Sequence, residues 1–343
     1  RIYGYNNVEI PTQLKSTLTI AGDVDKAHHR ANVVSEQLVG EGFNEILNNS
    51  LTKRSYYENT GLNCYTWDNT VRVINPLSSD LGVMRQTLLF GGLETIVRNV
   101  NRKNGNLKLF ELGNTYIYKK DNWTPEAPIK AYKQEGHLAM WVTGKRVSGS
   151  WAHPDEDASF YELKAYVENV LRRIGIAHNQ LVTDASDNNI FDKGLSLKNH
   201  GGKTLVELGV LSHKLLKDFD IDVPVFYADL DWDALMKLIS KNTLTFHEIS
   251  KYPAVSRDLA LLVDDSVTFA QIESIAQRAE KKLLKKVELF DVYTGDKLPQ
   301  GKKSYAVNFT LQDENKKKKK KAIDAIMKKL IHQLTTQLGA ELR

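Results

Sequence analysis

The sequence has almost no cysteine and no long apolar run. Cys64 is the only cysteine among 343 residues, which excludes a disulfide framework and a cysteine-based metal site. No stretch approaches the roughly 20 consecutive apolar residues that a membrane helix needs. With 41% hydrophobic and 26% charged residues, the composition predicts a globular protein of two or three domains in a reducing, cytoplasmic setting. Because the chain opens at Arg1, we also expect a fragment of a longer polypeptide.

The motifs of common catalytic and nucleotide sites are also missing. No HExxH, G-x-S-x-G, G-x-x-x-x-G-K-[ST] or G-x-G-x-x-G sequence occurs. The adjacent His28 and His29 point to different faces of a helix, and a surface role suits them better than metal binding. Residues 200–204, "HGGKT", fit a hairpin turn better than a phosphate loop. We therefore predict no catalytic and no metal-ligating residue.

Positive charge is present but local. The net charge is +5, and residues 251–343 hold 19 Lys and Arg against 12 Asp and Glu. Six of these cations form one run, Lys316 to Lys321, without which that segment is nearly neutral. The overall charge is therefore a weak reason to expect nucleic-acid binding.

Periodicity predicts alternating helices and strands in the first two thirds of the chain. Residues 23–39 suit a helix that glycines end, and Leu93, Ile96, Val97 and Val100 mark the core face of a second helix. Strands are expected at 107–118 and 137–144, with residues 119–134 as a loop between them. A third amphipathic helix is expected from Phe160, followed by further strands and helices to about residue 240.

The last 93 residues follow a different order. Strand, helix, strand, strand and helix succeed one another from Lys251, and a short strand "AELR" closes the chain. Thr268 and Gln271 form the capping box of the first helix. This β-α-β-β-α order with a short last strand is the ferredoxin-like plan. The fold class predicted for the whole chain is therefore α+β.

Several long sequence segments resemble those of one known family and occur in the same order along the chain. The chain resembles the C-terminal half of bacterial-type phenylalanyl-tRNA synthetase β subunits. The similarity rests on "RIYGYNNVEIP", "INPLSSDLGVMRQTLLFGGLETIVRNVNR", "LKLFELGNTY", "SFYELKAYVENVL" and "KYPAVSRDLALLVD". It runs almost from end to end.

The resemblance implies a domain order and a set of partners. Residues 1–20 would be a junction from an upstream domain. Residues 21–245 would be a class II synthetase-like antiparallel sheet module without catalytic activity, and residues 251–343 a ferredoxin-fold anticodon-binding domain. The complete enzyme would contain two α and two β subunits and join phenylalanine to tRNA(Phe) with ATP and Mg²⁺. The active site would belong to the α subunit, so this fragment would hold no cofactor.

The residues at the corresponding positions favour a non-catalytic module. Class II chemistry needs one arginine on a strand and a second beside glycines, to hold substrate and nucleotide phosphates. This sequence has Tyr116, Ile117 and Tyr118 at the first place, and Asp229, Asp231 and Asp233 at the second. Carboxylates there would repel the phosphates of ATP.

Six residues of the tail are candidates for contact with tRNA. Basic and aromatic side chains on the open face of a ferredoxin-like sheet can hold phosphates and stack on bases. The candidates are Lys251, Arg257, Lys302, Lys303, Tyr305 and Phe309. Two alternatives stay open: Tyr305 and Phe309 share one face and would be core if the helices cover it, and Arg257 could pair with Asp258.

Two other functions remain possible from the sequence. One is an independent enzyme with its own class II-like site, which the missing arginines disfavour. The other is a free-standing RNA-binding protein that uses only the tail domain. Co-purification with an α subunit would distinguish both from a synthetase fragment.

The lysine run precedes the last helix and is a poor helix start. Lysine cannot accept a hydrogen bond from the free N–H groups, and its charge opposes the helix dipole; a lost cap costs about 1 kcal/mol. We therefore expect a mobile or late first turn and a secure helix only from about Ala322. Contact of the run with RNA is an alternative.

Overall fold

The chain divides into two compact units, Arg1–Thr243 and Leu244–Arg343. The structure, a computed structural model, describes residues 2–9, 22–58, 60–177, 180–240, 242, 245–246, 248–295, 298–313 and 320–342. No helix in these ranges has the length and apolar character needed to span a bilayer.

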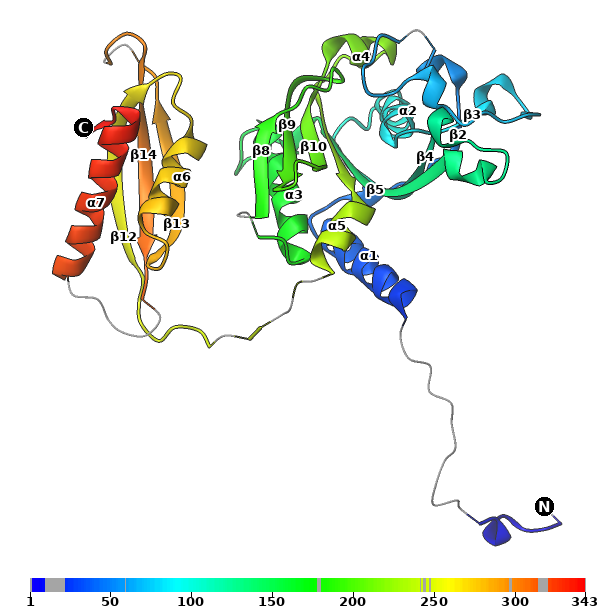
Figure 1. The fold of residues 1–343 in the computed structure, drawn as a ribbon, viewed down its shortest axis with the longest axis horizontal. Helices are drawn as coiled ribbons and strands as arrows, with labels where there is room; N and C mark the ends of the chain where they lie inside the picture. Colours follow the sequence, from blue (N-terminus) through cyan, green and yellow to red (C-terminus); the bar gives the residue numbers. More distant parts are fainter. Residues whose placement is uncertain are drawn as a thin grey trace. The chain divides into compact units, whose positions relative to one another are not determined.

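The N-terminal unit is built on a mixed sheet that is antiparallel except at one edge (Figure 1). Within the described residues it has seven strands, and the short β1 pairs in parallel with β4. The strands in spatial order are β1 (Asn44–Glu45), β4 (Leu107–Tyr118), β5 (Tyr132–Thr143), β11 (Val225–Asp231), β10 (Thr204–Leu211), β9 (Phe191–Asn199) and β8 (Leu181–Ala185). The turn between β9 and β10 is the hairpin that "HGGKT" predicts.

Three helices cover one face of this sheet. They are α1 (Asp23–Gly40), α3 (Phe160–Arg173) and α5 (Trp232–Ile239). Alternate residues of the strands, such as Phe110 and Met140, meet Leu38 of α1 and Leu163 of α3 in one buried cluster. Because side chains alternate between the two faces of a strand, the intervening residues face the other side of the sheet.

A second buried cluster lies on that other side. It joins Leu109, Trp141 and Tyr227 of the sheet with α2 (Leu89–Val100) and α4 (His213–Asp218). Leu93 and Ile96 are fully buried here, as the helical periodicity predicts. Gly92 lets α2 approach the sheet closely, since a Cβ at this position would lie 2.1 Å from Trp141 Cε2.

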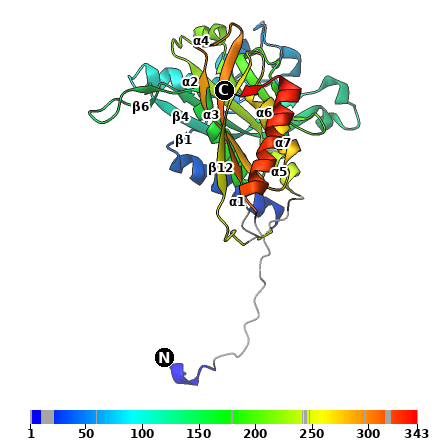
Figure 2. The ribbon, with the colours of Figure 1, turned by 90° about the vertical axis from the view of Figure 1, so that its left-hand side faces the viewer.

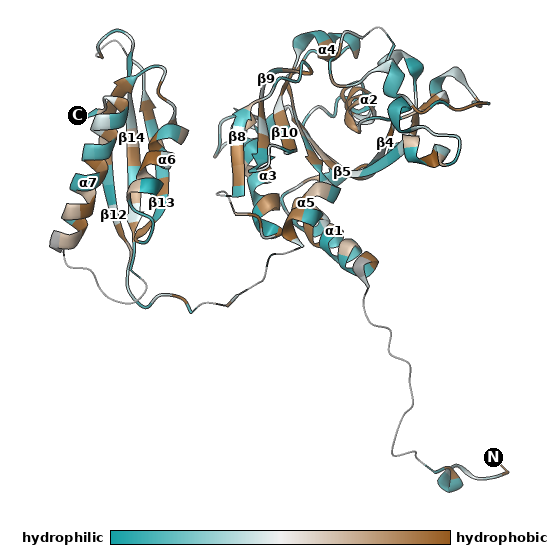
Figure 3. Cartoon of the chain, viewed as in Figure 1, coloured by the Kyte–Doolittle hydropathy of each residue, from teal (hydrophilic) through white to brown (hydrophobic). Residues whose placement is uncertain are grey.

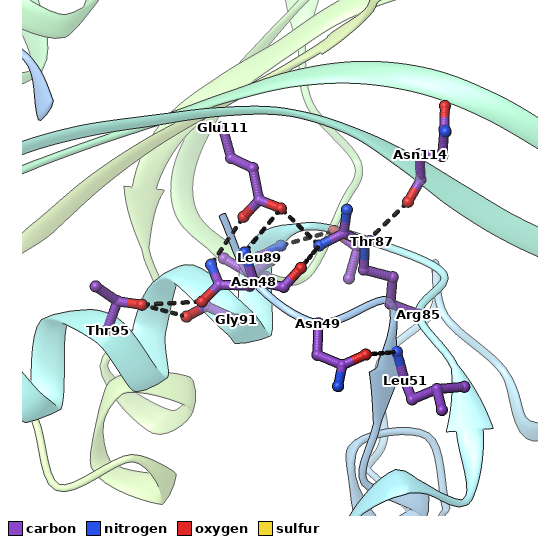
Figure 4. A network of polar contacts seen from close by, with 10 residues as sticks. All are labelled: Asn48, Asn49, Leu51, Arg85, Thr87, Leu89, Gly91, Thr95, Glu111 and Asn114. Atoms are coloured by element: carbon purple, nitrogen blue, oxygen red, sulfur yellow. Dashed lines mark hydrogen bonds and ion pairs between the residues drawn. The ribbon is translucent and has the colours of Figure 1, made fainter. Parts of the chain in front are cut away.

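A buried ion pair fixes the segment before α2 to β4 (Figure 4). Arg85 Nη1 lies 2.6 Å from Glu111 Oε1, and these two residues are 6% and 0% exposed. Arg85 also donates to the carbonyl oxygens of Asn114 and Asn48. The Asn48 amide in turn donates to Glu111 Oε2 at 2.7 Å and accepts a bond from Thr95 of α2. One network therefore ties together a loop, a helix and a strand.

The connection between β4 and β5 differs from the prediction. β5 begins at Tyr132, not at residue 137, because Tyr132 to Gly136 pair with Asn114 to Tyr118 of β4. The rest of the connection contains two short 3-10 helices, η5 (Lys120–Asn122) and η6 (Pro128–Ala131). The predicted loop is therefore three residues shorter at its end and is partly helical.

The C-terminal unit has the predicted strand and helix order. It consists of β12 (Val255–Asp264), α6 (Phe269–Ala279), β13 (Leu284–Tyr293), β14 (Lys302–Leu311), α7 (Lys320–Leu338) and β15 (Glu341–Leu342). The strands lie in the order β13-β14-β12-β15, all antiparallel. The α+β fold class is confirmed.

Both helices of this unit lie on one face of its sheet (Figures 1 and 2). Ile272 of α6 and Leu330 of α7 pack with Leu261 of β12 and Val307 of β14 in a third buried cluster. Each helix carries apolar residues together with hydrophilic ones, as expected of a helix with one buried face (Figure 3). The opposite face of the sheet has no helix on it among the described residues of this unit.

Two predictions concern residues that the structure leaves undescribed. Lys316 to Lys319 lie outside the described ranges, so the predicted late or mobile start of the last helix stays a prediction. The described helix α7 begins at Lys320, two residues before Ala322. Most of the predicted junction at residues 1–20 also lies outside the described residues.

Candidate nucleic-acid interface

The two faces of the C-terminal sheet have different surroundings, which decides the role of its aromatic residues. On β14, Tyr305, Val307 and Phe309 alternate toward the helices. Tyr305 is 8% exposed and donates a hydrogen bond to the carbonyl of Val267, and Phe309 is fully buried. The prediction that these two rings contact tRNA is therefore corrected, because both belong to the core beneath α6 and α7.

The four basic candidates lie at two ends of the sheet. Lys302 and Lys303 begin β14, where Lys302 pairs with Glu341 at 2.7 Å. Lys303 Nζ donates to the carbonyl of Asp265 and lies 5.0 Å from the centroid of the Tyr305 ring. Hydrogen bonding to Glu341 is the main cause of a raised pKa of Lys302, so its ammonium is charged.

The other two basic candidates lie near the start of β12. Lys251 is exposed, and Arg257 is half-buried and donates to the carbonyl of Ser256. Asp258 accepts a hydrogen bond from Asn308. The structure therefore does not gather the four cations into one patch, and their contact with tRNA stays a prediction.

Alternation from Leu289 places Phe290 of the edge strand β13 on the open face, and a β-bulge then places Tyr293 there as well. Glu288 of β13 pairs with Asn308, but the register then shifts between Leu289 and Asp291. After this bulge Val292 lies opposite the buried Tyr305, and Tyr293 lies opposite Ser304 on the open face. Phe290, the extra residue of the bulge, is 60% exposed, and Tyr293 is 37% exposed.

Small residues leave space beside these two rings. Ala260 of β12 lies opposite Ala306 of β14, and Ser304 is the next residue of β14 on the same face. Short side chains in the middle of a sheet, with aromatic rings at the side, allow a flat base to lie on the strands. The open face is defined here by Ala260, Ala306, Phe290, Asp291 and Tyr293, whereas Ser304, opposite Tyr293, is only 7% exposed.

The acidic positions of the N-terminal unit have structural partners. Asp231 caps α5 by accepting from the N–H of Ala234 at 2.8 Å and also pairs with Lys203. Asp233 accepts from the N–H of Gly136 at 2.8 Å. Asp229 lies 2.6 Å from Nδ1 of His137 on the neighbouring strand β5. Within the described residues, no group of three or more His, Cys, Asp and Glu side chains is arranged to hold a metal ion.

The His137–Asp229 pair makes the stability of the N-terminal unit depend on pH. Burial lowers the pKa of His137, but the charge and hydrogen bond of Asp229 outweigh it and raise that pKa to about 9. Since the unfolded value is 6.5, the pair stabilises the folded state fully below pH 6.5 and loses this effect up to pH 9. We expect a loss of about 1–3 kcal/mol over this range.

This prediction is checked by urea denaturation at several pH values, followed by tryptophan fluorescence. The control is His137→Gln, which cannot titrate and should show a flatter dependence between pH 6.5 and 9. Parallel curves for the two proteins would contradict the role of the pair.

Both units match models of known protein families. A family model described as "Phenylalanyl tRNA synthetase beta chain CLM domain" matches residues 10–232. A second, described as "Ferredoxin-fold anticodon binding domain", matches residues 250–343. The chain belongs to the phenylalanyl tRNA synthetase beta chain family. The resemblance seen in the sequence is thereby confirmed.

Relatives in this family are similar along the whole chain. Proteins named "Phenylalanine--tRNA ligase beta subunit" are 57% identical over 343 residues in Bacteroides thetaiotaomicron and 48% identical over 343 residues in Porphyromonas gingivalis. The one in Clostridium tetani is 32% identical over 345 residues. Each match covers 100% of this chain but only 41–42% of the relative. The chain therefore spans about two fifths of the length of these β subunits.

The sequence contains a signal for the position of Tyr293, which is not among the six tRNA-contact residues predicted from the sequence. Apolar residues of β13 follow a two-residue step at Val287 and Leu289 and then a three-residue step to Val292. A three-residue step inside a strand marks a bulge, after which the two faces exchange residues. Reading that step would have put Tyr293 on the face opposite to Leu289.

Proposed function

We propose that this chain is the C-terminal part of a phenylalanine–tRNA ligase β subunit. The complete enzyme joins L-phenylalanine to tRNA(Phe), using ATP and Mg²⁺, in the cytoplasm. The N-terminal unit is a non-catalytic scaffold for the α subunit, with two copies of each subunit in the enzyme. The C-terminal unit binds the anticodon region of the tRNA. Support comes from the family membership and from the names of relatives at up to 57% identity.

The open face of the C-terminal sheet is the observation that carries the RNA-binding role. Phe290 and Tyr293 are exposed at its edge. In the middle of this face, Ala260 and Ala306 have short side chains that leave room for a base. Unstacked bases of an RNA loop stack on such rings, and each stacked base contributes about 1–3 kcal/mol. An anticodon loop presents such bases, whereas a paired RNA stem does not.

The partners of three aspartates support the scaffold role. Asp229, Asp231 and Asp233 hold His137, the start of α5 and the backbone of Gly136. Their carboxylates replace the groups that a nucleotide site would need for binding phosphates, and they would repel ATP. The chain would therefore contribute shape and RNA contacts to the enzyme, and the α subunit the reaction.

The RNA-binding role is tested with the full chain and a fluorescein-labelled tRNA(Phe) transcript. Fluorescence anisotropy of the variant Phe290→Ala/Tyr293→Ala should show affinity reduced about tenfold or more, since two stacking surfaces are lost. The control is Tyr161→Ala/Phe246→Ala, which removes two rings that are 79% and 86% exposed but lie off the sheet. Unchanged affinity in the first variant, or an equal loss in the control, would contradict the proposal.

Co-expression with an α subunit separates this proposal from a free-standing RNA-binding protein. The synthetase fragment should co-purify with the α subunit, and the complex should survive loss of Phe290 and Tyr293. A chain that binds tRNA without forming any complex would support the free-standing alternative instead.

A further inference from the structure

A hollow of about 840 Å³ lies beside the β4–β5 connection of the N-terminal unit. Its wall includes η3 (Trp67–Asn69) with the segment that follows it, the end of β4, η5 and the start of β5. The backbone here is held firmly, because Arg72 bridges to Val83 and the N–H of Lys119 donates to the carbonyl of Ala131 at 2.7 Å. The hollow is distinct from the open face of the C-terminal sheet.

Three cations line this hollow without carboxylate partners. Arg72, Lys119 and Lys120 are exposed, and none of them has an ion pair within the described part of the chain. The Arg72 guanidinium lies over the ring of Trp67, with 4.4 Å between Cζ of Arg72 and the ring centroid. A guanidinium that contacts a ring face through its carbon keeps N–H donors that can bind phosphate oxygens.

Two tyrosines complete the wall. Tyr118 and Tyr132 are paired residues of β4 and β5, with ring centroids 5.3 Å apart. Tyr132 is 52% exposed, so part of its ring faces solvent. A base can stack on such a ring, as in proteins that bind single-stranded RNA.

Two carboxylates, Asp68 and Asp121, also line the hollow and weaken its positive charge. The three cations exceed them by only one charge, so charge alone does not decide the ligand. The combination of unpaired cations with an exposed aromatic ring indicates RNA as the ligand, because every nucleotide of RNA supplies a phosphodiester group and a base. A protein partner would need acidic residues and an apolar side chain at matching positions.

We infer that this hollow binds RNA, with phosphates on Arg72, Lys119 and Lys120 and an unpaired base on Tyr132. The N-terminal unit then contacts the RNA through its own site, whatever the C-terminal sheet binds. In the complete enzyme this would give the same RNA two separate anchoring points on one chain.

The test uses the full chain, the labelled tRNA(Phe) transcript and a labelled 12-nucleotide oligouridylate. Arg72→Gln/Lys119→Gln/Lys120→Gln should lower the affinity for each RNA about tenfold. The slope of log affinity against log salt should fall by about two to three, because up to three phosphate contacts disappear. Tyr132→Ala should lower the affinity about fivefold with little change in this slope.

The matched control removes three other cations of the same unit that are already paired. Lys145→Gln/Arg146→Gln/Lys203→Gln breaks pairs with Asp157, Glu156 and Asp231, and it changes the net charge equally. An equal loss of affinity in this control would overturn the proposal, since it would show a general charge effect. Tryptophan fluorescence should show unchanged melting for both triple variants.

Combination with Phe290→Ala/Tyr293→Ala separates this inference from the proposed function. If the hollow variants weaken binding and the sheet variant does not, the hollow is confirmed and the anticodon-face proposal fails. If the sheet variant weakens binding and the hollow variants do not, the inference that the hollow binds RNA is wrong and the proposed function stands. Unchanged RNA binding with a lost α-subunit complex would identify the hollow as a protein interface and overturn the inference.

Discussion

Replacing Phe309 with alanine is expected to lower the melting temperature of the C-terminal unit by roughly 15–30 °C. Phe309 is fully buried on β14 and packs in the cluster formed by the sheet, α6 and α7. Loss of a buried phenylalanine leaves a cavity and costs about 3–5 kcal/mol. A domain of this size is stabilised by only about 5–15 kcal/mol in total, so the unit would be close to unfolding at ordinary temperatures.

The chain provides its own control and its own separate probes. Phe290→Ala is the same substitution in the same unit at a ring that is 60% exposed, and it should change stability by less than about 0.5 kcal/mol. All five tryptophans lie in the N-terminal unit, so their fluorescence should not respond to Phe309→Ala. Circular dichroism, which detects helices in both units, should show the earlier transition.

Substitutions of Phe309 and Phe290 are expected to have different effects on stability and on RNA affinity. Phe309→Ala should lose stability, and Phe290→Ala should lose RNA affinity while the unit stays folded. If Phe309→Ala melted normally and bound tRNA weakly, the assignment of the two faces of the sheet would be wrong.

Local patterns in the sequence predicted most elements of the fold. The periodicity of Leu93 and Ile96, the capping box at Thr268 and the turn at "HGGKT" each involve residues close together in the chain. The early start of β5 at Tyr132 could not be read in this way, because it depends on pairing with β4 across the connection. Strand ends are set by such partners more than by local preference.

The candidate site was predicted less well, for a related physical reason. Tyr305 and Phe309 were correctly placed on one face together, but only packing shows that the helices cover this face. Tyr293 reaches the open face because a single extra residue of β13, Phe290, reverses the alternation that follows. Arg72 and Lys119 line one hollow although they are far apart in the sequence, and no spacing in the sequence indicates this.

The Arg85–Glu111 pair was also invisible in the sequence, and it supports a second large prediction. Arg85→Met should destabilise the N-terminal unit by about 3–5 kcal/mol, because the carboxyl group of Glu111 would stay fully buried without its partner. The amide groups of Asn48 would remain as donors to Glu111, but they cannot replace a full positive charge. Urea denaturation followed by tryptophan fluorescence measures this change in the unit that contains the pair.

The double variant Arg85→Met/Glu111→Leu distinguishes the cost of an unpaired charge from the cost of lost packing. If the unpaired carboxylate causes most of the loss, removing it as well should restore about 1–4 kcal/mol, although both polar partners are gone. The control Arg146→Met breaks a pair with Glu156 whose side chains are 53% and 47% exposed, and it should cost less than about 1 kcal/mol. A double variant no more stable than Arg85→Met would instead assign the loss to the bonds with Asn48 and Asn114. The network would then act mainly by holding the loop and α2 against β4.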